Sequence, residues 1–130
     1  MTVGKAIAEV DELWVNAYCT EQKITWLSRC ESTIDKEIIQ IYAGCHEPFR
    51  GFGHKTDREG VPVDINDERL IAGEPYDQLY IYWLEAMIHY ADGEIQKYNN
   101  AIAQYQALFD AFRKWYGRNR RQRFGDRFRF

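Results

Sequence analysis

The stretch PYDQLYIYWLEAMIHYADGEIQKYNNAIAQYQALFDAFRKWY, residues 75–116, decides the fold because it carries the longest helical pattern in the chain. Its apolar residues recur at intervals of three and four, the spacing that places side chains on one face of an α-helix. They are Leu79, Trp83, Met87, Ala91, Ile95, Tyr98, Ile102, Tyr105, Phe109, Phe112 and Tyr116. The pattern predicts a fold in which helices dominate.

The dipeptide Asp92-Gly93 interrupts this stretch without changing the phase of the apolar pattern. A reversal of the chain normally needs a few linker residues, which would reset the phase. We therefore expect one long helix over residues 76–116, kinked or weakened at Gly93, and about 60 Å long at 1.5 Å per residue. The alternative is an αα-hairpin that turns at Asp92-Gly93. Both alternatives give an all-α fold, a small helical bundle with a long C-terminal helix.

Two shorter helices are expected before this stretch. Thr2 can cap the first and Thr20 the second, and Gly44 is a natural stop for the second. The expected apolar face of the first helix is Val3, Ile7, Val10 and Trp14, and that of the second is Ile24, Leu27, Ile34, Ile38 and Ile41.

Residues 45–74 show no helical period. An irregular segment of about thirty residues is uncommon in a compact domain, and such segments are usually functional or disordered. We expect this loop to become ordered on assembly, against a neighbouring subunit or another partner. Its alternating apolar residues also suggest a short strand or β-arm, which would pair with a neighbouring subunit because two strands alone are not stable. The candidate contact residues are Phe49, Phe52, Val61, Val63 and Ile65.

Charge is divided unevenly along the 130 residues. Residues 1–112 hold nine basic and nineteen acidic side chains, a net of −10, whereas residues 113–130 hold eight basic and one acidic, a net of +7. Such asymmetry is typical of a terminal segment that meets a partner. We divide the chain into a helical domain, residues 1–116, and a C-terminal arm, residues 117–130.

The arm, GRNRRQRFGDRFRF, contains six arginines and three phenylalanines. Gly117 is expected to end the long helix, and an extended arm is expected beyond it. Arginines can pair with carboxylates or neutralise phosphates, and phenylalanines can fill pockets or stack on bases. The arm therefore indicates an acidic protein partner or a nucleic acid, and a solvated end without a partner is the remaining alternative. The candidate binding residues are Arg118, Arg120, Arg121, Arg123, Phe124, Arg127, Phe128, Arg129 and Phe130.

Catalytic and metal-binding motifs are not evident. The chain lacks the phosphate-binding, dinucleotide-binding, zinc-protease and nucleophile-elbow patterns. Cys45-His46 with His54 falls short of the four ligands that zinc normally takes. Glu85 and His89, four residues apart, are more typical of a surface pair than of an acid and base. We expect no enzyme activity, cofactor or metal.

The three cysteines are odd in number and show no CxxC spacing, which fits free thiols in a reducing cytoplasm. No apolar run reaches eighteen residues, and the first residues do not read as a signal peptide, so no membrane partner is expected.

Several segments resemble the small head–tail adaptor, or connector, proteins of long-tailed bacteriophages and prophages of Gram-positive bacteria. Near the start they are VDEL at 10–13, N-x-Y at 16–18 and K-I-x-W-L at 23–27. Later come P-Y-D-x-L-Y-x-Y-W-L-E-A at 75–86 and G-E-x-x-x-Y-N-N at 93–100. Their order and spacing carry the resemblance, which covers most of the chain outside residues 45–74. The loop and the arginine-rich end depart from the family pattern.

The resemblance implies a structural role in the virion neck, with assembly in the host cytoplasm. Such adaptors form a ring, commonly of twelve copies, beneath the portal, extend the DNA channel and dock the next neck, stopper or tail-completion protein. Their C-terminal segment typically grips the portal. An acidic body suits a channel in which packaged DNA slides without sequence-specific binding. The competing interpretation is a small helical nucleic-acid-binding or regulatory protein that uses its arginine-rich tail.

Overall fold

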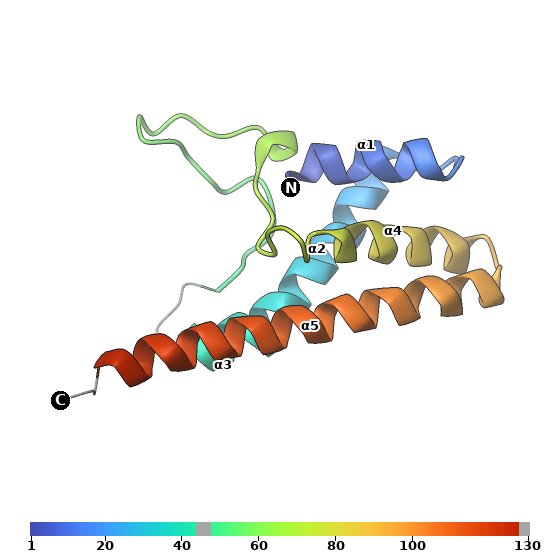
Figure 1. The fold of residues 1–130 in the computed structure, drawn as a ribbon. Coiled ribbons are helices and arrows are strands. Elements are labelled where there is room, and N and C mark those ends of the chain that lie inside the picture. The colour runs from blue at the N-terminus through green and yellow to red at the C-terminus, as the bar shows by residue number, and fades with distance from the viewer. Residues whose placement is uncertain (44–47, 128–130) are drawn as a thin grey trace.

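The computed structural model describes the backbone of residues 1–43 and 48–127 and the side chains of residues 1–42 and 48–119. Over these residues the fold is all-α and contains no β-strand (Figure 1). The helices are α1 (Val3–Leu13), α2 (Thr20–Ile34), α3 (Gln40–Ala43), α4 (Gln78–Ala91) and α5 (Ile95–Arg127), with a π-helical turn at Asp35–Ile39 and a 3₁₀ turn at Ile65–Asp67. The all-α prediction is confirmed.

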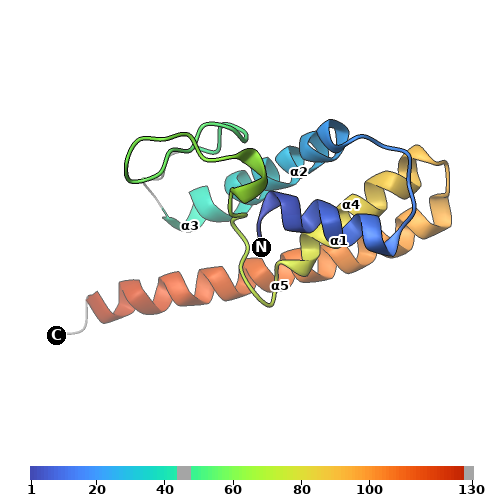
Figure 2. The ribbon, with the colours of Figure 1, turned by 90° about the horizontal axis from the view of Figure 1, so that it is seen from above.

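Helices α4 and α5 form an antiparallel hairpin and lie side by side in both ribbon views (Figures 1 and 2). The chain reverses at Asp92, Gly93 and Glu94, and Gly93 has a φ of 78°, a left-handed conformation that favours glycine. The expected single helix over 76–116 is therefore wrong, and the hairpin alternative is correct. The apolar phase across the turn does not mark one buried face, since Ala91 and Ile95, on either side of the turn, are exposed.

Helix α4 is the centre of the bundle, since α1, α2 and α5 all pack against it. It is consequently buried on several sides rather than along one stripe. Leu79, which the periodic pattern includes, is buried, but Trp83 and Met87 are half-buried and Ala91 is exposed. The buried residues of α4 are Leu79, Tyr80, Ile81, Leu84, Ala86, Ile88 and His89.

The N-terminal helix follows the sequence prediction. The Thr2 side chain caps α1 by accepting a hydrogen bond from the Lys5 amide at 3.2 Å. Val3, Ile7 and Val10 are buried, as expected from their spacing. The second helix begins one residue earlier than a Thr20 cap would give, because Cys19 occupies the cap position.

A π-helical turn at the end of α2 changes the register of its apolar face. This turn accommodates an extra residue, so that both Ile38 and Ile39 are buried. Ile41, which a regular helix would turn inward, is 66% exposed. The expectation that Ile41 belongs to the core is therefore wrong, and Gly44, the expected stop, lies outside the described residues.

The tip of the irregular loop pairs with itself. The Asp57 amide donates to the Val61 carbonyl and the Val63 amide to the Lys55 carbonyl, both at 2.9 Å. Gly60 between them has a φ of 81°. Between the two sides of this tip the possible β-arm amounts to a single bridge, Thr56 to Pro62. Pairing with a neighbouring subunit stays a prediction.

Candidate binding surface at the C-terminal end of α5

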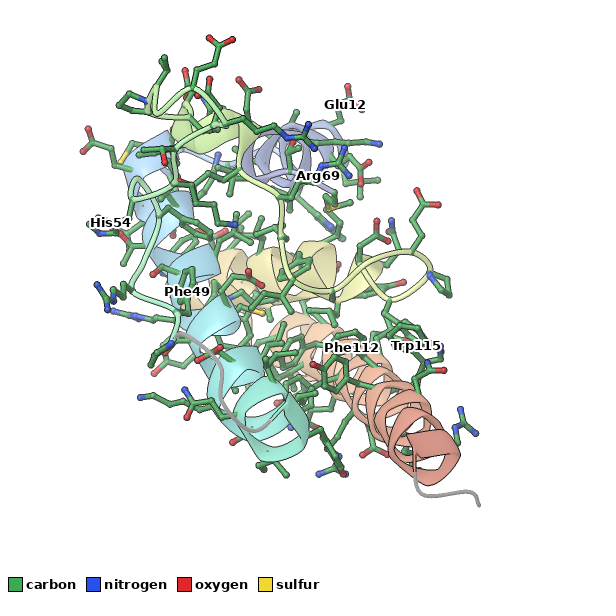
Figure 3. All side chains as sticks on the ribbon, turned by 90° about the vertical axis from the view of Figure 1, so that its left-hand side faces the viewer. Glu12, Phe49, His54, Arg69, Phe112 and Trp115 are labelled. Carbon is green, nitrogen blue, oxygen red and sulfur yellow. The ribbon has the colours of Figure 1, made fainter. Side chains whose placement is uncertain are left out.

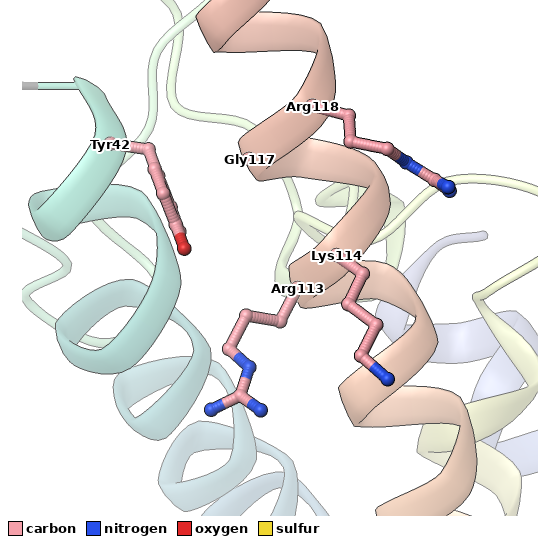
Figure 4. Close-up of a pocket in the computed structure, with 5 residues that line it drawn as sticks. All are labelled: Tyr42, Arg113, Lys114, Gly117 and Arg118. Atoms are coloured by element: carbon pink, nitrogen blue, oxygen red, sulfur yellow. The ribbon is translucent and has the colours of Figure 1, made fainter.

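Helix α5 is much longer than its partner α4 and extends past α3 beyond the other helices (Figures 1 and 2). Where it passes α3, a cleft of about 390 Å³ opens between the two helices. Figure 4 shows the cleft, lined by Tyr42 from α3 and by Arg113, Lys114, Gly117 and Arg118 from α5. The cleft places an aromatic ring opposite a group of basic side chains.

Gly117 lies inside α5 and is buried. A Cβ at this position would lie 3.0 Å from Cζ and 3.1 Å from Cε1 of Tyr42. The absence of a side chain at Gly117 therefore allows α3 and α5 to approach each other closely. The expectation that Gly117 ends the helix is wrong, and so is that of an extended chain directly after it, because the helix continues to Arg127.

A cluster of aromatic side chains around Phe112 packs next to the cleft. Phe112 is buried, with ring centroids 5.7 Å from Tyr76 and 6.0 Å from both Trp115 and Tyr116. The Tyr116 and Tyr42 rings meet edge to face at 6.2 Å. Figure 3 shows Phe112 and Trp115 side by side on α5. These contacts fix the base of the projecting helix against the body.

The basic residues of the cleft are only partly neutralised. Lys114 Nζ lies 3.1 Å from Asp110 Oδ2, and Arg113 pairs with the other oxygen of the same carboxylate. Hydrogen bonds from Lys114 and Arg113 lower the pKa of Asp110. The single negative charge of Asp110 thus faces the two positive charges of Arg113 and Lys114. Arg118 is exposed about one helical turn further along α5. The surface keeps a net positive charge and suits an anionic or acidic partner.

The structure places only part of the predicted arm. Arg118 lies at the cleft. The backbone of 120–127 is helical, and the side chains of Arg120, Arg121, Arg123, Phe124 and Arg127 lie outside the described part of the structure, as do Phe128, Arg129 and Phe130 entirely. The positions from 118 to 127 therefore belong to a helix rather than to an extended strand.

The five predicted loop residues do not form one exposed surface. Phe49 and Phe52 pack edge to face, with centroids 5.3 Å apart. Phe52 and Ile65 also pack against the chain's own core, whereas Val61 at the tip is 53% exposed. Val63 is half-buried beside it. Of these five residues, Val61 at the tip is the one that the structure leaves exposed.

Buried carboxylates hold the loop, a feature that the sequence analysis missed. Glu31 accepts a hydrogen bond from the Ile71 amide at 3.1 Å, Asp35 from the Phe49 amide at 3.2 Å, and Glu68 from the Gly53 amide at 2.7 Å. Glu31, Asp35 and Glu68 are each at most 2% exposed. The one sequence signal for these buried carboxylates is position: Glu31 and Asp35 lie on the inner face of α2 and of the turn that continues it.

Burial also changes the chemistry of Glu31. Desolvation raises the pKa of this carboxyl to about 7, against the hydrogen bonds from Tyr80 and Ile71, which lower it. The Tyr80 hydroxyl donates to Glu31 and accepts from the Ala72 amide. These contacts link α2, α4 and the end of the loop.

Glu85 and His89 do not form the expected surface pair, because His89 is 2% exposed. Its ring meets Trp14 edge to face at 4.7 Å. Its nitrogens lie 3.4 Å from Glu85 Oε1 and 3.3 Å from Glu94 Oε2. His89 is thus enclosed by the bundle and the turn.

The described residues contain neither a cluster of metal-ligand side chains nor a helix that could span a membrane. Within residues 1–43 and 48–127, no group of three or more His, Cys, Asp or Glu side chains could hold a metal ion. Cys45 and His46 lie outside the described residues. None of the described helices is both long and apolar enough to cross a membrane.

Comparison with known proteins gives no relative: no family model, curated protein or solved structure matches this chain.

Proposed function

We propose that this chain is a structural virion protein, a head–tail adaptor that forms a ring beneath the portal, extends the DNA channel and docks the next neck or tail protein. The observation that carries the proposal is the projecting end of α5, a basic helix anchored at its base and free of the other helices beyond it. The resemblance of segments on α1, α2, α4 and α5 to such adaptors supplies the identity of the partner.

The position of α5 suits a portal-binding element. Tyr42 and the aromatic residues around Phe112 hold the base of the segment, so its direction is set by the body. A pre-oriented helix loses less conformational entropy on binding than an extended arm does. The residues that follow Arg118 would then meet acidic groups and apolar pockets of the portal.

The loop tip is the second proposed contact. Residues 55–63 stand away from the helices, and buried carboxylates fix the segments on either side (Figure 1). A loop that is anchored on both sides and carries an exposed apolar residue at its tip, Val61, suits contact with an adjacent subunit or the next neck protein. The acidic residues 1–112 suit a channel wall that DNA passes without binding.

The competing function is nucleic-acid binding through the same basic helix, and the cationic cleft favours it as the second candidate. The two functions differ in what drives affinity. Phosphate contacts come from arginines and weaken steeply as salt rises. A protein pocket is filled by apolar anchors, each contributing roughly 1.5–3 kcal/mol when fully buried.

Capture by the portal distinguishes these functions. Purified portal protein from the same phage or prophage is immobilised, and binding is compared for the wild-type chain, a chain lacking residues 118–130, and Phe124→Ala/Phe128→Ala/Phe130→Ala. We expect both variants to lose capture while their helical circular dichroism is retained. Asp67→Lys, an exposed change outside both proposed contacts, is the control for nonspecific charge effects. Wild-type capture by the truncated chain would overturn the portal assignment.

A further inference from the structure

The end of the bundle opposite the C-terminus is built from three segments that we call the turn end: residues 11–23, residues 90–94 and residues 95–97 at the start of α5. The Tyr18 hydroxyl donates to Asp92 at 2.7 Å. Trp14 packs on His89, and Lys97 Nζ lies 5.9 Å from the centre of the Trp14 ring. These contacts join the α1–α2 connection to the α4–α5 turn (Figures 1 and 2).

The turn end exposes an unusual share of apolar surface. Among the described residues, seven large apolar side chains are exposed, and four of them lie here: Leu13, Val15, Tyr90 and Ile95. Each is between 64% and 101% exposed. Single exposed apolar residues are ordinary, but several on adjoining segments mark an interaction site.

The same end is acidic. It carries five acidic residues, Asp11, Glu12, Glu21, Asp92 and Glu94, and two lysines, Lys23 and Lys97, a net of −3 with His89 neutral. Lys23 pairs with Asp11, and Lys97 with Glu94. Glu12 and Glu21 are exposed. A partner for this surface must therefore be both apolar and basic.

The opposite end of this chain has that chemistry. The cleft contributes Arg113, Lys114 and Arg118. Ile41, next to Tyr42 on α3, is 66% exposed, and Trp115, on the side of α5 that packs on Tyr76, is 42% exposed. We call Ile41, Arg113, Lys114, Trp115 and Arg118 the base end, because they surround the base of the projecting helix. The two ends lie far apart along α5, so one molecule cannot join its own ends (Figures 1 and 2).

We propose that the base end of one copy docks on the turn end of a second copy, in a head-to-tail contact. Opposite charges orient the two surfaces, and the exposed apolar residues of both ends become buried. Because different surfaces meet, the contact is heterologous and closes into a ring when its rotation permits. The inference stands on the free chain and does not depend on the portal, since residues beyond Arg118 stay available to another partner.

Charge reversal tests this contact in the purified protein by sedimentation at low and high salt. We expect salt-sensitive self-association of the wild type, and weakening by about tenfold or more in Glu12→Lys/Glu21→Lys and in Lys114→Glu/Arg118→Glu. Because each variant has two ends of like charge, an equimolar mixture of the two should associate again through their complementary ends. Asp67→Lys/Glu74→Lys, with the same charge change at exposed positions outside both ends and outside the loop tip, should associate as the wild type does.

A cross-link reports the orientation. Cys19 is exposed at the turn end, and Asn119→Cys places a second thiol beside the base end. A head-to-tail contact predicts dimers linked through Cys19 and position 119, lost in Cys19→Ser/Asn119→Cys. A wild-type protein that stays monomeric at millimolar concentration, unaffected association in both reversal variants, or 119–119 links in place of mixed ones would overturn the proposal.

Discussion

Gly117 and Tyr42 meet where α5 passes α3, with only 3.0 Å between Cζ of the tyrosine and the position that a Cβ on the glycine would occupy. The contact fixes the angle at which α5 leaves the body. It also explains why a glycine occurs in the middle of a helix, where glycine lowers helix stability by about 1 kcal/mol relative to alanine.

Substitution of Gly117 should therefore depend on Tyr42. Gly117→Leu should destabilise the wild type by about 1–3 kcal/mol, because the larger side chain must displace the Tyr42 ring. With Tyr42→Ala already present, Gly117→Ala should instead stabilise by up to about 1 kcal/mol through helix propensity. Chemical denaturation of five proteins measures this coupling: the wild type, Gly117→Leu, Gly117→Ala, Tyr42→Ala and Tyr42→Ala/Gly117→Ala. Equal effects of Gly117→Ala with and without Tyr42, together with a tolerated Gly117→Leu, would mean that the two helices do not approach closely.

Stability should depend on pH through Glu31. Burial raises the pKa of this carboxyl in the folded protein to about 7, above its ordinary value of 4.5. Between these values the folded state holds the proton more tightly than the unfolded chain, so the free energy of unfolding falls as pH rises. The contribution is complete below about pH 4.5 and is lost near pH 7, a change of about 3 kcal/mol at 1.36 kcal/mol per pH unit.

Glu31→Gln isolates this contribution, because glutamine has nearly the same shape but does not ionise. Its single carbonyl oxygen can accept only one of the two hydrogen bonds that Glu31 accepts from Tyr80 and Ile71, so its overall stability is compared at each pH and only the slope is interpreted. The variant should lose most of the decline in stability between pH 5 and 7, measured by urea denaturation across that range. Glu37→Gln, an exposed change on the same stretch of helix, is the control and should keep the wild-type slope. Parallel pH profiles for Glu31→Gln and the wild type would contradict the buried, proton-binding carboxyl.

Hydrogen exchange should divide the loop into anchored and free parts. The amides of Phe49, Gly53 and Ile71 donate to buried carboxylates and should exchange slowly in the monomer. Amides at the tip, such as those of Arg58 and Glu59, should exchange fast and become protected only on assembly. Fast exchange at Gly53 and Ile71 before assembly would show that the anchors do not hold, and a tip with equal protection in both states would remove it as a contact.

His89 should act in stability and not in catalysis. Its ring is buried against Trp14, so His89→Ala should destabilise by about 2–4 kcal/mol. The purified protein should show no hydrolase or nuclease activity. Reproducible activity abolished by Glu85→Gln or Asp92→Asn, in variants that remain folded, would contradict this prediction.

The sequence predicted local features better than the relation between elements. The cap at Thr2 and the buried face of Val3, Ile7 and Val10 follow from helical spacing alone. The reversal at Gly93 could not be deduced from phase, because a glycine with a positive φ reverses the chain in three residues without disturbing the period. Ile41 is exposed because a π-helical turn shifts the register, which the intervals between apolar residues do not reveal.

The candidate site shows the same division. Composition indicated a basic segment after residue 112, and Arg118 does lie at a cationic cleft. Gly117 was interpreted as a helix stop because glycine often ends helices, whereas its contact with Tyr42 depends on tertiary packing. The buried carboxylates Glu31, Asp35 and Glu68 were missed because acidic residues are usually exposed, and their partners are backbone amides distant in sequence.

The central claim is that this chain forms a ring on the portal through the C-terminal end of α5. Electron microscopy of purified portal mixed with the chain, wild type or lacking residues 118–130, tests it most directly. The account predicts an additional ring of density beneath the portal with the wild-type chain and a bare portal with the truncated one. An identical ring with both chains would contradict the role of the segment, and a bare portal with both, with the chain bound instead to DNA in a salt-sensitive manner, would contradict the adaptor function itself.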